Sequence, residues 1–492
     1  MSQILRDARR YEEITEKKIK KEERPLFHLA ARVGWMNDPN GFSFYNGSYH
    51  MFYQYHPYNS HWGPMHWGHA VSKDLLHWTY LPAALAPDQA YDAAGCFSGS
   101  ALTLADGRQL LMYTGVHREE ADGVLRDVQT QCLAVGDGRD YEKYEANPVL
   151  DEKDLPEGNS KFDFRDPKMW QKADGSYRCV VGNCAGERDG QVLLFGSPDG
   201  FRWSFLKVLA ANNERFGKAW ECPDFFALDG RQVLLVSPMD MLPKGLEYHN
   251  GNGTLCLLGT YDEEQEVFVE EKDQAIDYGI DFYAPQTILT PDGRRVMIGW
   301  MQNWDTCNLH SPEKPWFGQM SLPRELSIRD GRLMQKPIRE LEMLRGEAVR
   351  YENITFAGVK TLEGISGRRV DMELVVRPVD ESNLFHKFSV WFAQNDIYHT
   401  SVSFRPWESI LKIDRKFSGT RRAVIHQRRS RVRNRNGEIK LRIILDTCSV
   451  EVFVNDGEQV LSATMYTDPA ADGISFLSDG IVTLDVVKYD LT

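Results

Sequence analysis

The segments Ser72-Lys-Asp-Leu-Leu-His-Trp78 and Ser197-Pro-Asp-Gly-Phe-Arg-Trp203 share the pattern S-x-D-x-x-x-W. A weaker copy is Gly138-Arg-Asp-Tyr-Glu-Lys-Tyr144, and a degenerate one begins at Thr260-Tyr-Asp262. The copies begin at residues 72, 138, 197 and 260, which are 66, 59 and 63 residues apart. A period of about 60 residues built from short strands is typical of a β-propeller with one blade per repeat. Residues 26–335 leave room for five blades; a chance series of loops is the alternative, and the near-equal intervals argue against it.

Between these markers the sequence consists of short apolar runs bounded by Gly, Asp, Asn and Pro. Runs of this length with turn residues between them are typical of strands rather than helices. We therefore expect an all-β region with almost no long helix. The clearest runs are Tyr49–Tyr55, Leu110–Gly115, Thr130–Val135, Tyr177–Gly182, Gln191–Gly196, Val233–Ser237, Thr254–Tyr261 and Arg295–Met301.

The two ends of the chain differ from this region. Residues 1–25 are polar and dense in opposite charges at helical spacing, which predicts a solvated N-terminal helix. Residues 336–350 are typical of a short helical linker. Residues 351–492 contain alternating runs such as Ser449–Asn455, which favour an antiparallel β-sandwich. The expected order is therefore a helical extension, a five-bladed β-propeller over residues 26–335, a linker and a β-sandwich.

The bulk composition excludes several classes of partner. The chain has 492 residues and a formal net charge of −13, which argues against nucleic acid because phosphate binding needs a basic surface. No stretch of about 18 apolar residues is present, so we expect no membrane span. The first 25 residues lack the apolar core of a signal peptide, and the eight cysteines show no CxxC pairs. We therefore expect a cytoplasmic protein, of an oligomeric state that the sequence does not indicate.

A second series of motifs lies between the blade markers. Asp38 in WMNDPNG, Ser98 in FSGS, Asp166 in RDP, Glu221 in ECPD and Asp281 in DFYAPQ are separated by 60, 68, 55 and 60 residues. Each motif therefore occupies a similar position in its own blade. Because equivalent positions of a propeller lie at similar radius and height, we expect these segments to converge on the central channel. Three carboxylates, those of Asp38, Asp166 and Glu221, would then lie together.

Three carboxylates at one channel mouth suit the hydrolysis of a glycosidic bond. One attacks the sugar or positions water, a second protonates the leaving oxygen, and the third can bind ring hydroxyls. Like charges held close together raise the pKa of one carboxyl group, which makes an acid available near neutral pH. A single NDPNG segment would more often be a turn than a catalytic site. Five motifs in register favour the site.

The same motifs resemble those of glycoside hydrolase family 32, the invertases and fructan hydrolases. The resemblance covers the whole expected propeller in order, and it implies a five-bladed propeller, a C-terminal sandwich and retention of anomeric configuration. The segments that carry it are WMNDPNG (35–41), FYQYHP (52–57), HWGHA (66–70), FSGS (97–100), FRDPK (164–168), WECPD (220–224), DFYAPQ (281–286), LPREL (322–326) and VEVFVNDGE (450–458).

This resemblance implies a retaining β-fructofuranosidase that hydrolyses the terminal β-D-fructosyl bond of sucrose, sucrose 6-phosphate or short fructooligosaccharides through a covalent fructosyl-enzyme. It assigns Asp38 as nucleophile, Glu221 as general acid/base and Asp166 as stabiliser of the transition state. Retention implies that the carboxyl groups of Asp38 and Glu221 lie about 5–5.5 Å apart. Arg165 is expected to keep its neighbour Asp166 ionised. The implied substrate-binding residues are Trp35, Asn37, Gln54, Trp62, Phe97, Ser98, Arg165, Tyr283 and Trp300.

Two local features leave alternatives open. His56, His61, His66 and His69 suggest a metal site, but no Asp or Glu accompanies them at ligand spacing. We therefore expect aromatic pocket lining or core there, and no metal or other cofactor. Cys222 follows the expected acid/base, and it is either a small buried neighbour or a group that tunes the pKa of the site.

The stretch Lys412–Arg435 contains ten Lys or Arg residues. It falls in the expected sandwich, where the solvated face of strands and loops is the simplest interpretation. Contact with an anion or with a partner subunit is the functional alternative. A phosphorylated sugar would need such cations, although nothing in the sequence places the stretch at the channel.

Two other functions compete with hydrolysis. A fructosyltransferase that builds short fructooligosaccharides would use the same covalent intermediate, and predominant kestose-type products at high sucrose would identify it. A non-catalytic carbohydrate-binding protein is disfavoured, because a binder need not retain all three acids. The sequence does not rank sucrose, its 6-phosphate and fructooligosaccharides as substrates.

Overall fold

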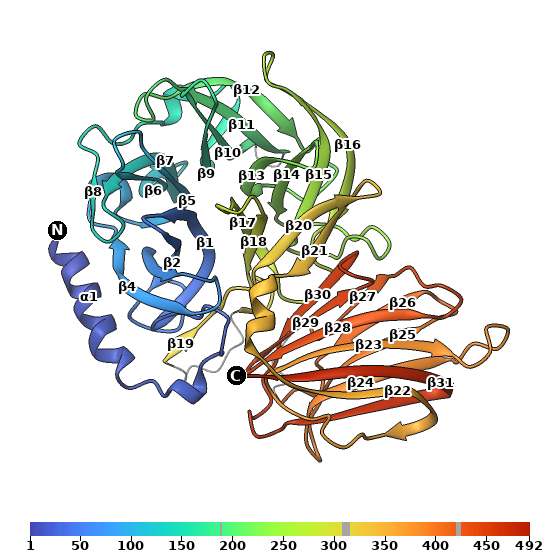
Figure 1. Ribbon diagram of the computed structural model, residues 1–492. Helices are drawn as coiled ribbons and strands as arrows, with labels where there is room; N and C mark the ends of the chain where they lie inside the picture. Colours follow the sequence, from blue (N-terminus) through green and yellow to red (C-terminus); the bar gives the residue numbers. More distant parts are fainter. Residues whose placement is uncertain (187–188, 308–314, 420–424) are drawn as a thin grey trace.

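The computed structural model of the protein describes residues 1–186, 189–307, 315–419 and 425–492. Five antiparallel sheets form a ring, and a large folded sheet packs beside the ring (Figure 1). The predicted all-β architecture, a five-bladed propeller followed by a β-sandwich with a short N-terminal helix, is confirmed. In the described part of the chain, no helix has the length and apolar character needed to cross a membrane.

The first strand of each blade lies nearest the ring axis, and these five inner strands contact one another around the ring. Blade I consists of β1 (Gly34–Tyr45), β2 (Ser48–His56), β3 (His66–Ser72) and β4 (Trp78–Leu85). Blade II consists of β5 (Gly95–Thr103), β6 (Gln109–Ala121), β7 (Val124–Gly136) and β8 (Tyr141–Lys143). Blade III consists of β9 (Asn159–Gln171), β10 (Tyr177–Ala185), β11 (Asp189–Ser197) and β12 (Ser204–Ala211).

Blades IV and V complete the ring. Blade IV consists of β13 (Trp220–Leu228), β14 (Arg231–Pro238), β15 (Leu255–Asp262) and β16 (Val267–Ala275). Blade V consists of β17 (Tyr283–Leu289), β18 (Arg295–Trp300), β20 (Arg324–Arg329) and β21 (Arg332–Pro337). Short 3-10 helices lie at η1 (Lys21–Glu23), η2 (Ala90–Asp92), η3 (Glu152–Asp154) and η5 (Arg339–Leu344).

The ring is closed by β19 (Trp316–Phe317), which pairs in parallel with the start of β1. The next residue, Gly318, has a φ of +97°, and a Cβ atom there would lie 2.1 Å from the carbonyl oxygen of Met36. Only glycine combines that backbone conformation with so close an approach. This closure holds the first motif of the chain next to the last blade.

The repeated markers form the turn between the third and the outer strand of a blade. In Ser72–Trp78 and Ser197–Trp203 the Ser and Asp side chains accept backbone N–H groups of the turn. Asp262 does the same in blade IV. In blade II the side chain that accepts these N–H groups is Asp137. The sequence repeat instead aligns Asp140, three residues later, with the Asp position of the pattern. The repeat therefore corresponds to one capped turn in each of blades I to IV.

The N-terminal helix α1 (Gln3–Glu16) lies against β4 of blade I (Figure 1). Its charge pattern predicts a fully solvated helix, but one face of α1 is buried. Its buried face is formed by Leu5, Ala8 and Glu12. The Glu12 carboxylate pairs with Arg32 at 2.9 Å and accepts the N–H of Ala83 at 2.9 Å. A polar sequence can dock in this way because a buried carboxylate is stabilised by a cation and a hydrogen-bond donor.

After η5 the chain forms the second structural region, in which the last six residues of the expected linker already belong to β22. The long strand β31 pairs with β24 through its first half and with β23 through its second half, so the sheet folds over on itself. Buried side chains from both halves form one core. The strands are β22 (Arg345–Lys360), β23 (Val370–Pro378), β24 (Lys387–Gln394), β25 (Thr400–Arg405), β26 (Ile410–Asp414), β27 (Gln427–Arg431), β28 (Ile439–Asp446), β29 (Ser449–Val454), β30 (Gln459–Thr464) and β31 (Gly473–Leu491).

Buried ionic groups connect the propeller with the sandwich. His28 lies with Nδ1 2.8 Å from Asp446 and Nε2 3.0 Å from Glu451. Arg324 of β20 donates to the same Glu451 and, at 3.0 Å, to Asp277. Because breaking a buried ion pair leaves a charge without a partner, these contacts fix how the two regions meet.

Candidate active site

Each inner strand carries a β-bulge at its motif. A bulge bends its strand and redirects the side chains on either side of it. The pairing register with the second strand of the blade shifts at Asn37–Asp38 in β1, Ser98 in β5, Asp166–Pro167 in β9, Cys222–Pro223 in β13 and Ala284–Pro285 in β17. The five motifs are therefore bulges at equivalent places in five blades.

The bulges refine the equivalence that the spacing predicted. Asp166, Cys222 and Ala284 have φ angles of +68°, +49° and +51°, and each precedes a proline. They occupy the same position, so the residue equivalent to Glu221 in blade V is Tyr283. Asp281, the reference residue that the spacing selected there, lies two residues earlier.

Asp281 has a structural environment. Its carboxylate pairs with Arg415 of the sandwich and accepts the N–H of Thr464 at 2.8 Å. Both side chains of the ion pair are almost completely buried. The motif DFYAPQ therefore contributes its tyrosine to the site, and its aspartate contacts the sandwich.

Asp38 is surrounded by hydrogen-bond donors from three blades. Asn37 Nδ2 donates to Oδ1 at 3.1 Å, and Ser98 Oγ donates to Oδ2 at 3.0 Å. The thiol of Cys222 lies 3.4 Å from the same Oδ2. Trp35 Nε1 donates to Asn37 Oδ1 at 2.7 Å, which orients the Asn37 amide toward the carboxylate.

Cys222 connects two of the three acids. Its backbone N–H donates to Asp166 Oδ2 at 2.9 Å, and its thiol lies 3.5 Å from the same oxygen. The thiol of one residue therefore contacts both Asp38 and Asp166, and the preceding residue is Glu221. This arrangement brings the three predicted carboxylates into one site.

Glu221 is held by one cation and one phenol. Arg165 Nε donates to Oε1 at 3.0 Å, and the Tyr283 hydroxyl lies 2.6 Å from Oε2. Arg165 is itself fixed by Asp163 Oδ1 at 3.0 Å and Gln129 Oε1 at 3.2 Å. The carboxyl group therefore has one fixed orientation at the channel.

Burial and mutual repulsion set the charge state of two acids. Burial, and then the charge of Glu221, raise the pKa of Asp38 to about 6, against hydrogen bonds from Asn37 and Ser98 that lower it. Burial raises the pKa of Asp166 to about 7, although the charge of Arg165 lowers it. The charge of Arg165 favours the ionised form of Asp166 in the expected direction, but burial outweighs it, so an ionised Asp166 stays a prediction.

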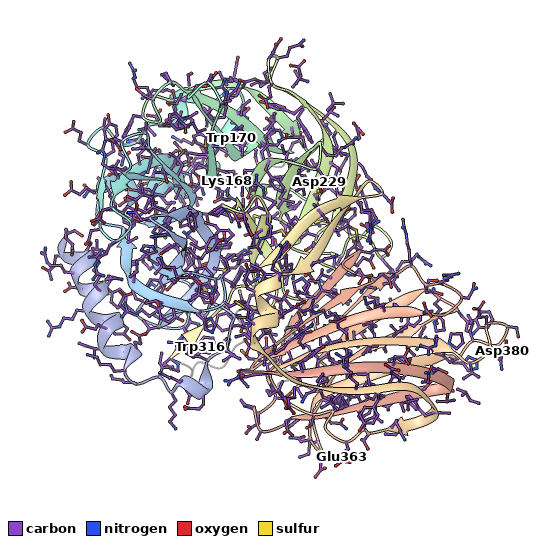
Figure 2. All side chains as sticks on the ribbon, in the orientation of Figure 1. Lys168, Trp170, Asp229, Trp316, Glu363 and Asp380 are labelled. Atoms are coloured by element: carbon purple, nitrogen blue, oxygen red, sulfur yellow. The ribbon has the colours of Figure 1, made fainter. Side chains whose placement is uncertain are left out.

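Below the acids, polar contacts tie the inner strands together. Lys168 of β9, near the centre of the ring in Figure 2, donates to the carbonyl oxygen of Thr287 in β17 at 2.8 Å and lies 3.3 Å from Asp224 in β13. Asp224 also accepts the N–H of Thr287 at 2.6 Å. These contacts hold blades III, IV and V at a fixed distance, which is the kind of rigid support a catalytic site needs.

Aromatic side chains surround the acids on the side of blades I and V. Trp35 stacks on Phe317 with ring centroids 5.1 Å apart and lies 6.0 Å from Trp300. Cys222 and Tyr283 belong to the same buried cluster. Near the acids, Trp62 is 43% exposed and meets Phe97 edge-on at 6.1 Å. Phe97 precedes Ser98, the hydrogen-bond partner of Asp38, and an exposed indole in this position is suited to stacking on the apolar face of a sugar.

The predicted pocket residues fall into two groups. Asn37, Ser98, Arg165 and Tyr283 contact one of the acids directly, and Trp35 contacts them through Asn37. Gln54 and Trp300 are buried, and Gln54 Nε2 donates to the carbonyl oxygen of Cys96 at 3.0 Å. Among the described contacts, neither Gln54 nor Trp300 reaches a carboxylate, so their place in the pocket stays a prediction.

Three of the four histidines considered as a metal site contact a backbone carbonyl group or another ring, and in the described part of the chain no three His, Cys, Asp or Glu side chains are grouped as metal ligands. His56 and His66 each place Nδ1 near the carbonyl oxygen of Pro64, at 3.3 and 3.0 Å. His69 stacks on Phe52 with centroids 4.0 Å apart, and its Nε2 lies 3.0 Å from His50. These contacts order the strand pair β2–β3 and its connecting loop.

Several residues that contact the site could not be recognised from the sequence. Thr114 Oγ1 accepts the N–H of Asp166 at 3.0 Å, and Gln129 orients Arg165. The carbonyl oxygen of Ser237 lies 3.0 Å from the Tyr283 hydroxyl. All three lie on the second or third strand of a blade; Thr114 and Ser237 fall within apolar runs that predict strands but not sites, and Gln129 immediately precedes such a run.

Taken together, the site has two buried carboxyl groups of raised pKa and a third held by a cation and a phenol. Such a set can supply a nucleophile and a proton donor side by side, as glycoside hydrolysis requires. A polyhydroxylated substrate would find acceptors in the carboxylates and stacking surfaces in the aromatic residues.

Comparison with known proteins agrees with this chemistry. The model "Glycosyl hydrolases family 32 N-terminal domain" matches residues 28–337, and "Glycosyl hydrolases family 32 C terminal" matches residues 340–491. Raffinose invertase of Escherichia coli is 38% identical over 483 residues, which covers 93% of this chain and 94% of that protein. Sucrose-6-phosphate hydrolase of Escherichia coli is 37% identical over 472 residues, 94% of this chain and 93% of the relative.

Solved structures show the same fold over nearly the whole length. The Bombyx mori GH32 β-fructofuranosidase superposes with a TM-score of 0.83 at 34% identity, covering 99% of this chain and 97% of that one. Sucrose-6-phosphate hydrolase from Lactobacillus gasseri gives a TM-score of 0.83 at 27% identity, with 100% and 96% covered. The family resemblance of the motifs is confirmed: the chain belongs to glycosyl hydrolase family 32.

Proposed function

We propose that the protein is a retaining β-fructofuranosidase that releases the terminal fructosyl unit of sucrose, sucrose 6-phosphate or a short fructooligosaccharide. The observation that carries this proposal is the contact of Cys222 with both Asp38 and Asp166, next to Glu221. Relatives named as invertases and sucrose-6-phosphate hydrolases support the substrate class. A solved structure of a Bombyx mori β-fructofuranosidase variant in complex with sucrose supports a small sugar as ligand.

Asp38 is the nucleophile of the proposed first step. Its carboxylate attacks the anomeric carbon of the fructosyl unit, while Glu221 gives a proton to the glycosidic oxygen and the rest of the sugar departs. Hydrogen bonds from Asn37 and Ser98 hold the Asp38 carboxylate in position and favour its charged form. The product of this step is a covalent ester between Asp38 and the fructosyl unit.

Glu221 reverses its role in the second step. As a carboxylate it takes a proton from water, the water oxygen attacks the anomeric carbon, and the ester bond to Asp38 breaks. Arg165 and Tyr283 keep the Glu221 carboxyl group in one orientation through both steps. Asp166 binds ring hydroxyls and stabilises the charge that develops on the sugar ring.

Two substitutions test the acids. Asp38→Ala removes the nucleophile, and Glu221→Gln keeps the size of the side chain but removes the proton. Each should abolish release of reducing sugar from sucrose while thermal unfolding stays unchanged. Asp229→Asn, in the β13–β14 turn and labelled in Figure 2, is the matched control and should retain activity. Full activity in either acid variant would overturn the assignment.

The ranking of substrates is a separate question. We expect kcat/KM on sucrose, sucrose 6-phosphate, kestose and inulin, measured side by side, to favour the small substrates over the polymer. A cytoplasmic location stays a prediction of the sequence, and cell fractionation tests it.

A further inference from the structure

The basic stretch Lys412–Arg435 is divided between the inside and the outside of the molecule. Arg415 is buried against Asp281 of the propeller, and Arg428 donates to the propeller loop before β15. Residues 420–424 of the stretch lie outside the described residues. The other described cations of β26 and β27 face solvent, and the proposed catalytic reaction does not use them.

The outward face of strands β24 to β27 carries cations from all four strands. Lys412 of β26 pairs in the ladder with Ser403 on one side and with Arg429 on the other. Lys387 and Arg405 lie at the adjoining end of the β24–β25 ladder. The residues that alternate with them are buried in the sandwich core, so these five side chains point away from it.

A cavity of about 200 Å³ opens among these side chains. Its polar lining consists of four cations, Lys387, Arg405, Lys412 and Arg429, together with Ser403, Gln427 and the single carboxylate of Glu408. The four cations donate hydrogen bonds and cannot accept them, and the one carboxylate pairs with Arg405. The cavity is therefore built for a ligand that is rich in acceptors and negatively charged.

The charges of this cavity do not balance. Glu408 pairs with Arg405 at 3.0 Å, and Asp414 pairs with Lys412 at 2.7 Å. Within the described residues, Lys387 and Arg429 have no carboxylate at ion-pair distance. Burial and then the charges of Lys412 and Arg405 lower the pKa of Lys387, and they outweigh the charges of Asp414 and Asp479, which raise it. Two cations without an ion-pair partner are available to bind the two negative charges of a phosphate monoester.

A second cavity, of about 590 Å³, adjoins the first and shares Lys387, Arg405 and Glu408 with it. It adds Trp407, which is 64% exposed, and the polar side chains of Asn383 and Asp479. An exposed indole beside carboxylate and amide groups offers a stacking surface and hydroxyl partners, which is what a sugar ring needs.

We propose that this outer face of the sandwich binds a phosphorylated monosaccharide. The phosphate lies among Lys387, Lys412 and Arg429, and the sugar ring lies against Trp407. The site is separate from the three acids, and it holds or fails independently of the proposed hydrolase mechanism.

Calorimetric titration of the full chain tests this site with three probes: glucose 6-phosphate, inorganic phosphate and glucose. Glucose 6-phosphate should bind most tightly. The double variant Lys387→Gln/Arg429→Gln should weaken it by about tenfold for each charge removed. Lys387→Arg, which keeps the charge, should retain the wild-type affinity. Trp407→Ala should weaken glucose 6-phosphate and leave inorganic phosphate unchanged.

Lys440→Gln is the matched control, because Lys440 is also a half-exposed sandwich cation but pairs with Asp456 at 2.6 Å. It should bind glucose 6-phosphate like the wild type. Unchanged affinity in the double variant would place the ligand elsewhere, for instance among the catalytic acids, and would overturn the proposal. Equal affinity for phosphate and glucose 6-phosphate, with no effect of Trp407→Ala, would also overturn it, because the face would then bind any small anion.

Discussion

The phenolic oxygen of Tyr283 lies 2.6 Å from Glu221 Oε2 and 3.0 Å from the carbonyl oxygen of Ser237. One phenolic proton cannot serve both acceptors at the same time. When Glu221 is ionised, the phenol donates to it; when Glu221 is protonated, Glu221 donates to the phenol, which then donates to Ser237. The array satisfies Glu221 in both states, as a group that alternates between acid and base requires.

Tyr283→Phe should therefore lower kcat more than it changes KM. Removing the phenol leaves the protonated form of Glu221 without its acceptor, and we expect a loss of kcat of about tenfold to a hundredfold on sucrose. Tyr248→Phe is the matched control, since that phenol also contacts a carboxylate, Asp273 at 2.5 Å, away from the acids. Equal kinetics of the two variants would contradict a role for Tyr283 in the reaction.

The pH dependence of kcat/KM should follow the ionisation of the Asp38 carboxyl group. A nucleophile must be ionised, and the pKa of Asp38 is raised to about 6, so kcat/KM should fall as the pH drops below about 6. The Ser98 hydroxyl stabilises the charged form and lowers that pKa. Ser98→Ala should thus move the acid limb of the profile to higher pH.

Ser100→Ala is the control for this shift, because Ser100 lies in the same strand and its hydroxyl accepts the N–H of Met169 at 2.9 Å. Its acid limb should coincide with that of the wild type. An acid limb near the ordinary carboxyl pKa, or one that Ser98→Ala leaves in place, would mean that Asp38 does not control the reaction.

The propeller was predictable from sequence because two of its features are local. The eight apolar runs fall on second and third strands such as β2, β10 and β15, which are buried on both faces and so read as continuous apolar segments. The capped turns between the third and outer strands produced the period of about 60 residues in the sequence. Inner strands such as β13 do not form continuous apolar runs in the sequence, because their polar motifs and bulges interrupt them.

The residues that meet in the candidate site could be predicted from the motifs. The charge states of the acids and the equivalence of residues between blades could not. Because a bulge changes the register of its strand, equal spacing could not identify Tyr283, two residues after Asp281, as the counterpart of Glu221. The contact of Arg165 with Glu221 joins residues 56 apart, and the docking of Glu12 on Ala83 joins residues 71 apart. No local pattern reports contacts over such distances.

Asp281 should matter for stability and not for chemistry. Asp281→Asn leaves Arg415 buried without a counterion, which should cost about 3–5 kcal/mol of unfolding free energy. The folded fraction should keep the wild-type kcat on sucrose. Calorimetry and active-site-normalised kinetics measure the two effects, and a variant that unfolds normally but hydrolyses sucrose slowly would show that Asp281 acts on the substrate.

His28 should make the stability of the protein depend on pH. Burial alone would lower its pKa, but hydrogen bonds and charges from Asp446 and Glu451 outweigh burial and raise the pKa to about 9. The stabilisation is therefore complete below the ordinary value of 6.5 and is lost as the pH rises through about 9.

Chemical unfolding at both ends of this range tests the prediction. His28→Ala should be less stable than the wild type by about 3–5 kcal/mol near pH 6, and the difference should shrink above pH 9 or so. His77→Ala, which removes an exposed histidine paired with Asp74 at 2.7 Å, should change stability little. A deficit of His28→Ala that is the same at both pH values would contradict the raised pKa.

If Asp38 forms a covalent bond to the fructosyl unit, the product keeps the anomeric configuration of the substrate, and methanolysis measures that configuration. With methanol as acceptor, two displacements at the anomeric carbon restore the original configuration, so the first fructoside formed from sucrose should be methyl β-D-fructofuranoside by NMR. Initial formation of the α-anomer would mean a single displacement, and the account of Asp38 as nucleophile would be wrong.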